Sequence, residues 1–228
     1  MNNRRIWFRL GGVLAAAAVC TGGAAVVSDR AQEAKNVQRA FFGAMETQMQ
    51  IGCYPSETGS PADLTERERT ELQTAYISRV EQYYTEENPC RKRYIALNED
   101  FLTACDSDVE YSESGGVADC RFDSVRLYAD RMTAVVQAQT VVWDKRISGN
   151  PEQGFSVELP VNRDTITATM KKENGVWKLD SIDSQISLSA AVPSDDEVCR
   201  ERYPTFETAR QVADSIDDQA YIKEARFA

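Results

Sequence analysis

The sequence contains no histidine. Ser-His-Asp and Cys-His catalysis, histidine metal sites and imidazole pH switching are therefore excluded, because each needs an imidazole side chain. Acid–base chemistry at neutral pH would need a carboxyl or lysine group whose pKa burial had moved far from its ordinary value. The sequence also lacks a glycine-rich phosphate loop and a nucleophile elbow. It therefore predicts neither enzymatic activity nor a cofactor.

The cysteines show no CxxC spacing, so the usual arrangement of zinc-binding thiolates is missing. Asp106, Asp108 and Glu110 resemble the start of a calcium-binding loop. The sixth position of that loop should be glycine, and here it is Tyr111. We therefore predict no metal site.

Positive charge is scarce: 26 Lys and Arg residues stand against 36 Asp and Glu residues, which gives a formal charge of −10. An acidic surface repels phosphate backbones and anionic lipid headgroups. Nucleic acid is therefore not expected as a partner, and anionic lipid is not expected on the general surface.

The positive charge that is present begins the chain, where Arg4, Arg5 and Arg9 precede the uncharged run LGGVLAAAAVCTGGAAVVS at residues 10–28. Eighteen apolar residues form roughly 27 Å of helix, just short of a hydrocarbon core of about 30 Å. The positive-inside rule places the N-terminus in the cytoplasm and the rest of the chain outside. We predict a single-pass membrane protein with a signal anchor at residues 1–28.

Two alternatives to an uncleaved anchor remain open. Gly23-Ala24-Ala25 supplies small residues that signal peptidase accepts, which would give a secreted protein after cleavage. Cys20 could carry a lipid, although Val19 precedes it where a small residue is preferred. The anchor is favoured because residues 31–50 have helical spacing of apolar residues and would continue the helix out of the membrane.

The rest of the chain divides into three segments. Residues 29–61 are predicted to form a stalk helix and a linker, because residues 51–62 are rich in glycine, proline and serine. Residues 62–188 are long enough for one domain with its own core. Residues 189–228 are predicted to form a polar tail that ends in an amphipathic helix at about 206–221.

Two helices are expected at the start of the domain. The segment from Thr65 to Glu68 has the pattern of a capping box and predicts a helix that runs to about Thr85. Pro89 is well placed as the first residue of a second helix, where the missing N–H costs no hydrogen bond.

From about Asp106 the apolar period changes to two, which is typical of strands. Gly115–Gly116 predicts a hairpin turn, and Asn174–Gly175 predicts another. The apolar parity changes near Asp123–Ser124, which predicts a β-bulge that bends the strand. The fold class expected is α+β, with N-terminal helices packed on a strongly bent antiparallel sheet and a transmembrane or signal segment before them.

The disulfide pattern is left open by the sequence. Five cysteines follow Cys20, namely Cys53, Cys90, Cys105, Cys120 and Cys199. Cys90 and Cys105 would lie roughly 22 Å apart at opposite ends of a helix, too far for a disulfide. Cys53 and Cys199 could meet, and Cys120 is expected to be a buried free thiol on an apolar strand face.

The segment KKENGVWKLDSI at residues 171–182 resembles the last hairpin of the nuclear transport factor 2-like superfamily, whose members fold as a cystatin-like cone. The order of helices and bent strands over residues 62–188 is similar as well. The resemblance implies a curved sheet around a cone that holds a carboxylate, tyrosine or histidine in the enzymes of the superfamily. The arrangement of an N-terminal anchor followed by such a domain is also similar to that of anchored bacterial envelope proteins. These include bitopic assembly components of type IV secretion and conjugation machines. The domain also resembles the one that precedes amidases in Firmicutes.

A cone of this kind would have a small set of polar candidates for its interior, namely Tyr76, Tyr83, Tyr94, Asp100 and Asp180. The tyrosines lie on helical apolar stripes, which favours packing over catalysis. Trp143 and Trp177 are interpreted as caps of the core. Trp177 and Leu179 should face the Tyr76 helix stripe, because alternate residues of a strand share a face.

Thr165, Thr167 and Thr169 alternate with apolar residues and form an exposed row, which is either solvated or a contact with a partner. We predict an extracytoplasmic protein-interaction domain that binds other envelope proteins or itself, with an envelope or secretion complex as its setting. The alternatives are a small-ligand-binding or enzymatic cone and a cleaved secreted protein.

Overall fold

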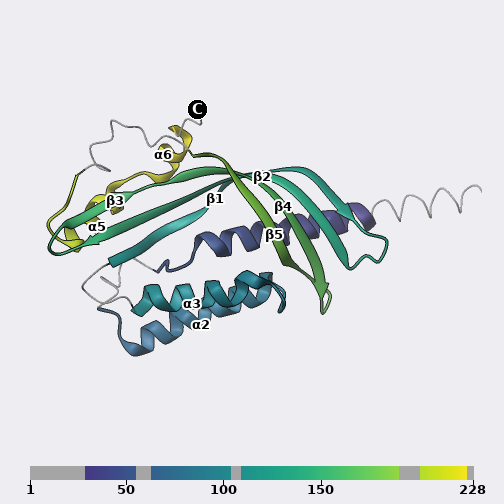
Figure 1. Cartoon of the computed structure of the whole chain (residues 1–228), viewed down its shortest axis with the longest axis horizontal. Coiled ribbons are helices and arrows are strands. Elements are labelled where there is room, and N and C mark those ends of the chain that lie inside the picture. Colours follow the sequence, from purple (N-terminus) through teal and green to yellow (C-terminus); the bar gives the residue numbers. More distant parts are fainter. Residues whose placement is uncertain (1–28, 55–62, 104–108, 190–200, 225–228) are drawn as a thin grey trace, which may run out of the picture.

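The computed structural model describes residues 29–54, 63–103, 109–189 and 201–224 (Figure 1). Within these ranges, helices pack on a single five-stranded antiparallel sheet. The expected α+β class is therefore confirmed.

The described helices follow the predicted start signals closely. Thr65 caps the second helix, and its capping box with Glu68 is formed as predicted. The next helix starts at Pro89. The helices are the N-terminal helix (residues 29–49), α2 (Glu66–Tyr83), α3 (Pro89–Thr103), α5 (Phe206–Ser215) and α6 (Asp218–Glu224).

The single C-terminal helix expected at residues 206–221 is two helices in the structure. The backbone at Ile216 is extended, and α6 begins two residues later. The Asp217 carboxylate accepts from the backbone N–H groups of Gln219 and Ala220, each at 3.1 Å. An aspartate favours such a cap over the helix interior, which explains the break.

The strands run up and down in the order β1-β2-β4-β5 across the sheet, and the short β3 pairs with the C-terminal end of β2. Asn174 and Gly175 both have positive φ, as the predicted tight turn requires. The register shifts between Phe122 and Ser124, which confirms the predicted bulge. The strands are β1 (Val109–Leu127), β2 (Thr133–Asn150), β3 (Gly154–Glu158), β4 (Val161–Glu173) and β5 (Val176–Ser189).

Gly115–Gly116 does not form the predicted hairpin turn and lies inside β1. A Cβ atom on Gly115 would lie 2.4 Å from the carbonyl oxygen of Met49, at the end of the N-terminal helix. The Glu46 carboxylate also accepts from the backbone N–H of Val117 at 2.8 Å. The glycines therefore allow a helix end to approach an edge strand, which is the other common reason for glycine in a strand.

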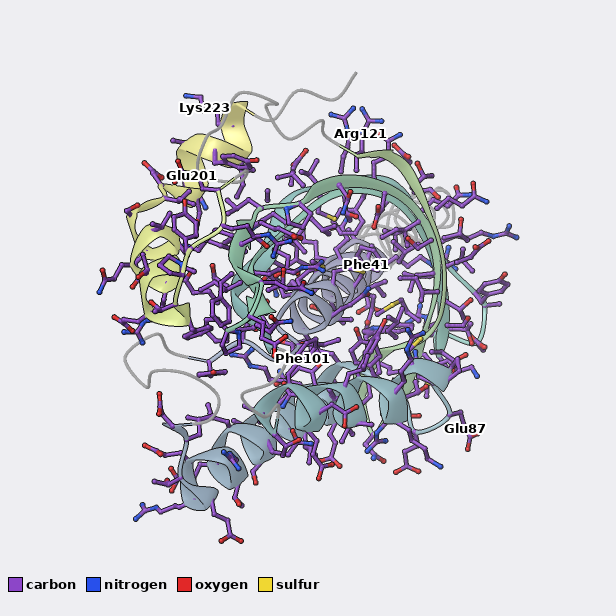
Figure 2. The ribbon with its side chains drawn as sticks, turned by 60° about the vertical axis from the view of Figure 1, so that its left-hand side comes forward. Phe41, Glu87, Phe101, Arg121, Glu201 and Lys223 are labelled. Atoms are coloured by element: carbon purple, nitrogen blue, oxygen red, sulfur yellow. The ribbon has the colours of Figure 1, made fainter. Side chains whose placement is uncertain are left out.

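The N-terminal helix lies on the concave face of the sheet, and Figure 2 shows Phe41 inside the curve of the strands. Val37, Phe41 and Ala44 have no exposed area and share one core with β2, β4 and β5. We expected residues 29–61 to form a stalk and linker outside a domain beginning at residue 62. The structure instead makes the helix part of the domain core. The sequence shows the apolar stripe of this helix, but the spacing of apolar residues alone does not tell which surface buries them.

A second core lies at the other end of the sheet, on the opposite face. Ala134, Val136 and Ala138 of β2 face the N-terminal helix, whereas Ile147 packs against α5. Ala209 and Ala213 of α5 have no exposed area, so the helix packs closely on the strands. Each end of the sheet therefore buries a different face.

The predicted placement of Trp177 is confirmed. Trp177 is 3% exposed and Leu179 has no exposed area, and both belong to the core that contains Tyr76 and Val80 of α2. The alternation within β5 was sufficient for this prediction because a strand presents every second residue to one face.

Cys53, Cys90 and Cys120 are free thiols, and all three are half-buried. Cys120 packs beside the first core on β1, as its parity with Phe122 predicted. Cys105 and Cys199 lie outside the described residues.

Among the residues that the structure describes, no helix is both long and apolar enough to cross a bilayer. The predicted signal anchor at residues 1–28 lies outside them. The anchor therefore stays a prediction.

Candidate functional site

The polar residues predicted for the interior of the cone are not gathered at one site. Tyr76 and Tyr94 are buried and Tyr83 is half-buried, whereas Asp100 is exposed. Asp180 forms an ion pair with Lys171 at 2.9 Å. The structure therefore does not bring a tyrosine and a carboxylate of this set together.

The buried tyrosine hydroxyls instead hold the N-terminal helix in place. Tyr76 donates to the carbonyl oxygen of Thr47 at 3.3 Å, and Tyr84, at the end of α2, donates to that of Ala44 at 2.7 Å. Burial raises the pKa of Tyr76 far above its ordinary value. A neutral hydroxyl that donates to a carbonyl group is suited to positioning rather than to proton abstraction.

Trp177 caps the first core and is tied to the N-terminal helix. Its indole N–H donates to the Glu33 carboxylate at 2.7 Å, and Lys172 donates to the same carboxylate at 2.8 Å. These hydrogen bonds, first that of Lys172, lower the pKa of Glu33. Trp143 is half-buried beside the second core. Both tryptophans therefore pack as the sequence suggested.

The threonine row lies on the outer, convex face of the sheet. Thr165 and Thr167 are exposed, and Thr169 is half-buried. Thr167 stands between Gln137 of β2 and Asp183 of β5, both of which are exposed. This part of the face is polar, and contact with a partner there stays a prediction.

The most unusual chemistry surrounds Lys145 of β2, whose side chain is only 6% exposed. Its ammonium nitrogen lies 3.2 Å from the Glu113 carboxylate of β1 and 3.0 Å from the Asp218 carboxylate of α6. It also donates to the carbonyl oxygen of Ala213 near the end of α5, at 2.9 Å. A buried lysine with several acceptors is stable because its charge is compensated on more than one side.

Glu113 titrates in an unusual range because of this environment. The pKa of Glu113 is raised to about 7: burial is the largest cause and a hydrogen bond with Asp214 adds to it, whereas Lys145 opposes both effects. Two carboxyl groups in contact bind a shared proton more readily than either does alone. Glu113 is therefore a group that changes its protonation state near neutral pH, without any histidine.

The Lys145 cluster is defined as Glu113, Lys145, Asp214 and Asp218. All of its members except Asp214 line an open groove of about 480 Å³. Arg79 of α2 and Gln50 also line the groove and are hydrogen-bonded to each other. The groove thus presents both signs of charge. Polar or charged ligands suit it better than apolar ones.

A series of hydrogen-bonded polar side chains lies close by but is unsuited to nucleophilic chemistry. The Cys53 thiol donates to Ser112 at 3.3 Å, and the Ser112 hydroxyl donates to Asp144 at 2.7 Å. Arg146 donates to the other Asp144 oxygen. Burial raises the pKa of the Cys53 thiol to about 12. The reactive thiolate is therefore strongly disfavoured. These hydrogen bonds instead fix the segment that follows the N-terminal helix.

Sequence reasoning missed the Lys145 cluster because its members come from β1, β2, α5 and α6. One signal was available: Lys145 shares strand parity with Trp143 and Ile147, which are apolar. A lysine at an inward position of a strand needs partners, and these were not visible in the spacing of the acidic residues.

Comparison with known proteins gives no match by sequence and a weak similarity to a solved structure. No protein-family model matches the sequence, and no curated protein matches it. Among solved structures, the crystal structure of the intermembrane space region of chloroplast protein ARC6 is similar with a TM-score of 0.44 at 13% identity. The match covers 68% of this chain and 97% of that one.

Proposed function

We propose that this chain is an extracytoplasmic, membrane-anchored domain that works by binding another protein, on a scaffold of the nuclear transport factor 2-like kind. The observation that supports this most is the position of the N-terminal helix. It occupies the concave face of the sheet, where Phe41 and Val37 have no exposed area. The side of the sheet where a cone of that superfamily would hold its ligand is filled by the chain itself.

The same helix supports the anchored topology. Residue 29 is already helical and follows directly on the apolar run at residues 10–28. Because the helix is part of the domain core, the domain would be held next to the membrane without a free linker. Other envelope proteins, or a second copy of this chain, are the partners in this proposal, and nucleic acid is not.

The outer face of the sheet is the surface we assign to the partner. Thr167, Gln137 and Asp183 are exposed side chains at one level of three adjacent strands. They offer donors and acceptors on a rigid surface, as the polar parts of transient interfaces do.

Site-specific photocrosslinking in intact cells tests this assignment. A photoreactive residue at Thr167 should give a discrete crosslinked product, whereas one at Glu152, in the exposed turn before β3, should not. Thr167→Arg should abolish a product formed from Gln137. Equal patterns at Thr167 and Glu152 would contradict the outer-face assignment.

Protease treatment of spheroplasts tests the topology separately. External protease should digest the domain, while the chain should stay with the membrane after alkaline carbonate extraction. Full protection from protease would contradict the extracytoplasmic assignment. A soluble product with a new N-terminus near Val26 would favour the cleaved, secreted alternative.

A second candidate function is the binding of a small polar ligand, or proton transfer, in the Lys145 groove. Glu113, with a pKa of about 7, is the observation that favours it. A ligand that binds there should shift the titration of Glu113, which carboxyl NMR of the labelled chain would detect.

A further inference from the structure

The exposed large hydrophobic side chains of the described residues are unevenly placed. Tyr128 is 44% exposed, Met132 is 48% exposed and Val176 is 51% exposed. These three lie at two hairpin tips, the β1–β2 tip and the β4–β5 tip, at the same end of the sheet. The fourth such side chain, Phe42, is 39% exposed and lies on the N-terminal helix. Large apolar side chains gathered at one end of a molecule commonly mark a contact surface.

The β1–β2 tip lies beside the start of the described N-terminal helix (Figure 1), and the β4–β5 tip lies further along the same helix. Asp29 forms an ion pair with Arg131 of the β1–β2 tip at 2.9 Å. Four residues further along the helix, Glu33 binds Lys172, which immediately precedes the β4–β5 tip region, at 2.8 Å. The β1–β2 tip is therefore fixed next to the point where the apolar run of residues 10–28 joins the domain, and the β4–β5 tip is fixed one helical turn further along.

The β1–β2 tip has a defined shape. The Asp130 carboxylate accepts from the backbone N–H groups of Met132 at 2.9 Å and Thr133 at 3.1 Å. The backbone N–H of Tyr128 donates to the carbonyl oxygen of Thr133 at 2.9 Å. Tyr128 and Met132 are therefore presented by a closed, hydrogen-bonded loop.

The acidic side chains at this end of the molecule are bound to Lys, Arg or backbone N–H groups, although the chain as a whole carries a negative net charge. Asp29 is paired with Arg131, Glu33 with Lys172, and Glu173 with Lys178 at 3.5 Å. Asp130 is bound to backbone N–H groups. This end of the molecule can therefore approach a lipid surface without the repulsion expected for a chain of net charge −10.

We propose that the two hairpin tips, at Tyr128–Met132 and Asn174–Val176, rest in the headgroup region of the bilayer. This inference depends on the proposed function, because it needs residues 10–28 to be in the membrane. Consecutive Cα atoms are about 3.8 Å apart, so Asp29 and the Arg131 bound to it must then lie at the membrane surface. A tyrosine suits that depth because its ring is apolar and its hydroxyl is wet.

The bilayer contact gives the domain a fixed orientation. One anchor alone would leave it free to tilt, whereas the two tips provide further points of support. The outer face of the sheet would then stand at a constant angle to the membrane.

Quenching of tryptophan fluorescence by brominated lipid tests the inference. The full-length chain is reconstituted into phosphatidylcholine vesicles with brominated acyl chains, and Tyr128→Trp is compared with Glu152→Trp at the opposite end of the sheet. The signal of the parent chain, with its own tryptophans, is subtracted from both. Interfacial side chains lie within about 10 Å of the acyl chains, so roughly half of the added Tyr128→Trp fluorescence should be lost.

The Glu152→Trp fluorescence should be unchanged in the same vesicles. Met132→Trp serves as a second variant, so that the result does not depend on one substitution being tolerated. Flotation of each sample shows whether the chain is bound to the vesicles. Chains that float but show equal quenching at Tyr128 and Glu152 would overturn this inference alone, and chains that do not float would overturn the anchored topology as well.

Discussion

Phe41 of the N-terminal helix and Phe122 of β1 meet edge to face, with ring centroids 5.7 Å apart and an interplanar angle of 70°. This contact joins a helix that precedes the predicted domain to a strand within it. Aromatic pairs in this geometry contribute about 0.5–1.5 kcal/mol beyond the area they bury. The helix is therefore a part of the fold.

Phe41→Ala should lower the free energy of unfolding by about 3–5 kcal/mol, as other truncations of buried aromatic side chains do. The neighbouring Phe42 is 39% exposed, so Phe42→Ala is the matched control and should cost far less. Chemical denaturation of both variants measures the difference. Equal losses would mean that the helix does not occupy the concave face.

Trp177→Ala should cost about 3–5 kcal/mol because it removes a buried side chain from the first core. Trp177→Phe keeps part of the ring packing but removes the hydrogen bond to Glu33, so its cost should include about 1–3 kcal/mol for that bond to a charged group. Thermal unfolding compares the two variants. A melting temperature unchanged by Trp177→Ala would place the side chain at the periphery.

Lys145→Met should lower stability by about 3–5 kcal/mol at pH 7, because it leaves buried carboxylates without their counter-charge. Lys171→Met is the matched control, since Lys171 also forms an ion pair but its side chain is 50% exposed. An exposed pair should cost less than about 1 kcal/mol. Similar losses for the two variants would show that the Lys145 cluster is not buried in solution.

Stability should fall as the pH rises from about 4.5 to about 7, because of Glu113. Its pKa is raised in the folded state from an ordinary value of 4.5 to about 7. A carboxyl group of this kind stabilises the fold fully below its unfolded pKa and loses that contribution as the pH passes its folded pKa.

Urea denaturation at a series of pH values measures this loss, which should be roughly 1–3 kcal/mol. Glu113→Gln keeps the shape of the side chain and removes its titration, so its stability should depend less on pH over the same interval. An identical pH profile for the variant would assign the dependence to other groups.

Gly115→Ala should destabilise the domain by about 1–3 kcal/mol, as overpacking does. The added Cβ would lie 2.4 Å from the Met49 carbonyl oxygen, which belongs to the backbone and cannot rotate away. Gly116→Ala is the control, because its Cβ would meet the end of the Glu46 side chain at 3.3 Å. A greater loss from Gly116→Ala would contradict the close approach of helix and strand.

Local patterns in the sequence were sufficient for the elements themselves. The capping box at Thr65 and the proline at position 89 placed two helix starts, since these residues act on the nearest turn of backbone. Parity was likewise enough to place Trp177 in the core and a bulge beside Ser124. Interactions between residues that are close in the sequence can therefore be predicted from the sequence.

Gly115–Gly116 shows where this reasoning ends. Glycine permits both a turn and a close approach of another backbone, and only the position of Met49 distinguishes them. The Lys145 cluster is similar, because Glu113 and Asp218 reach the same ammonium group from positions more than a hundred residues apart.

The sequence by itself determined the α+β class, the starts of α2 and α3 and the absence of imidazole chemistry, because these depend on composition and on local periodicity. Only the tertiary structure decided that the helix at residues 29–49 fills the concave face and that Glu113 titrates near neutral pH. An apolar stripe predicts that one face of a helix is buried, and a carboxyl side chain predicts a group that can ionise. Which surface buries the stripe, and which neighbours shift the pKa, depends on contacts between distant segments.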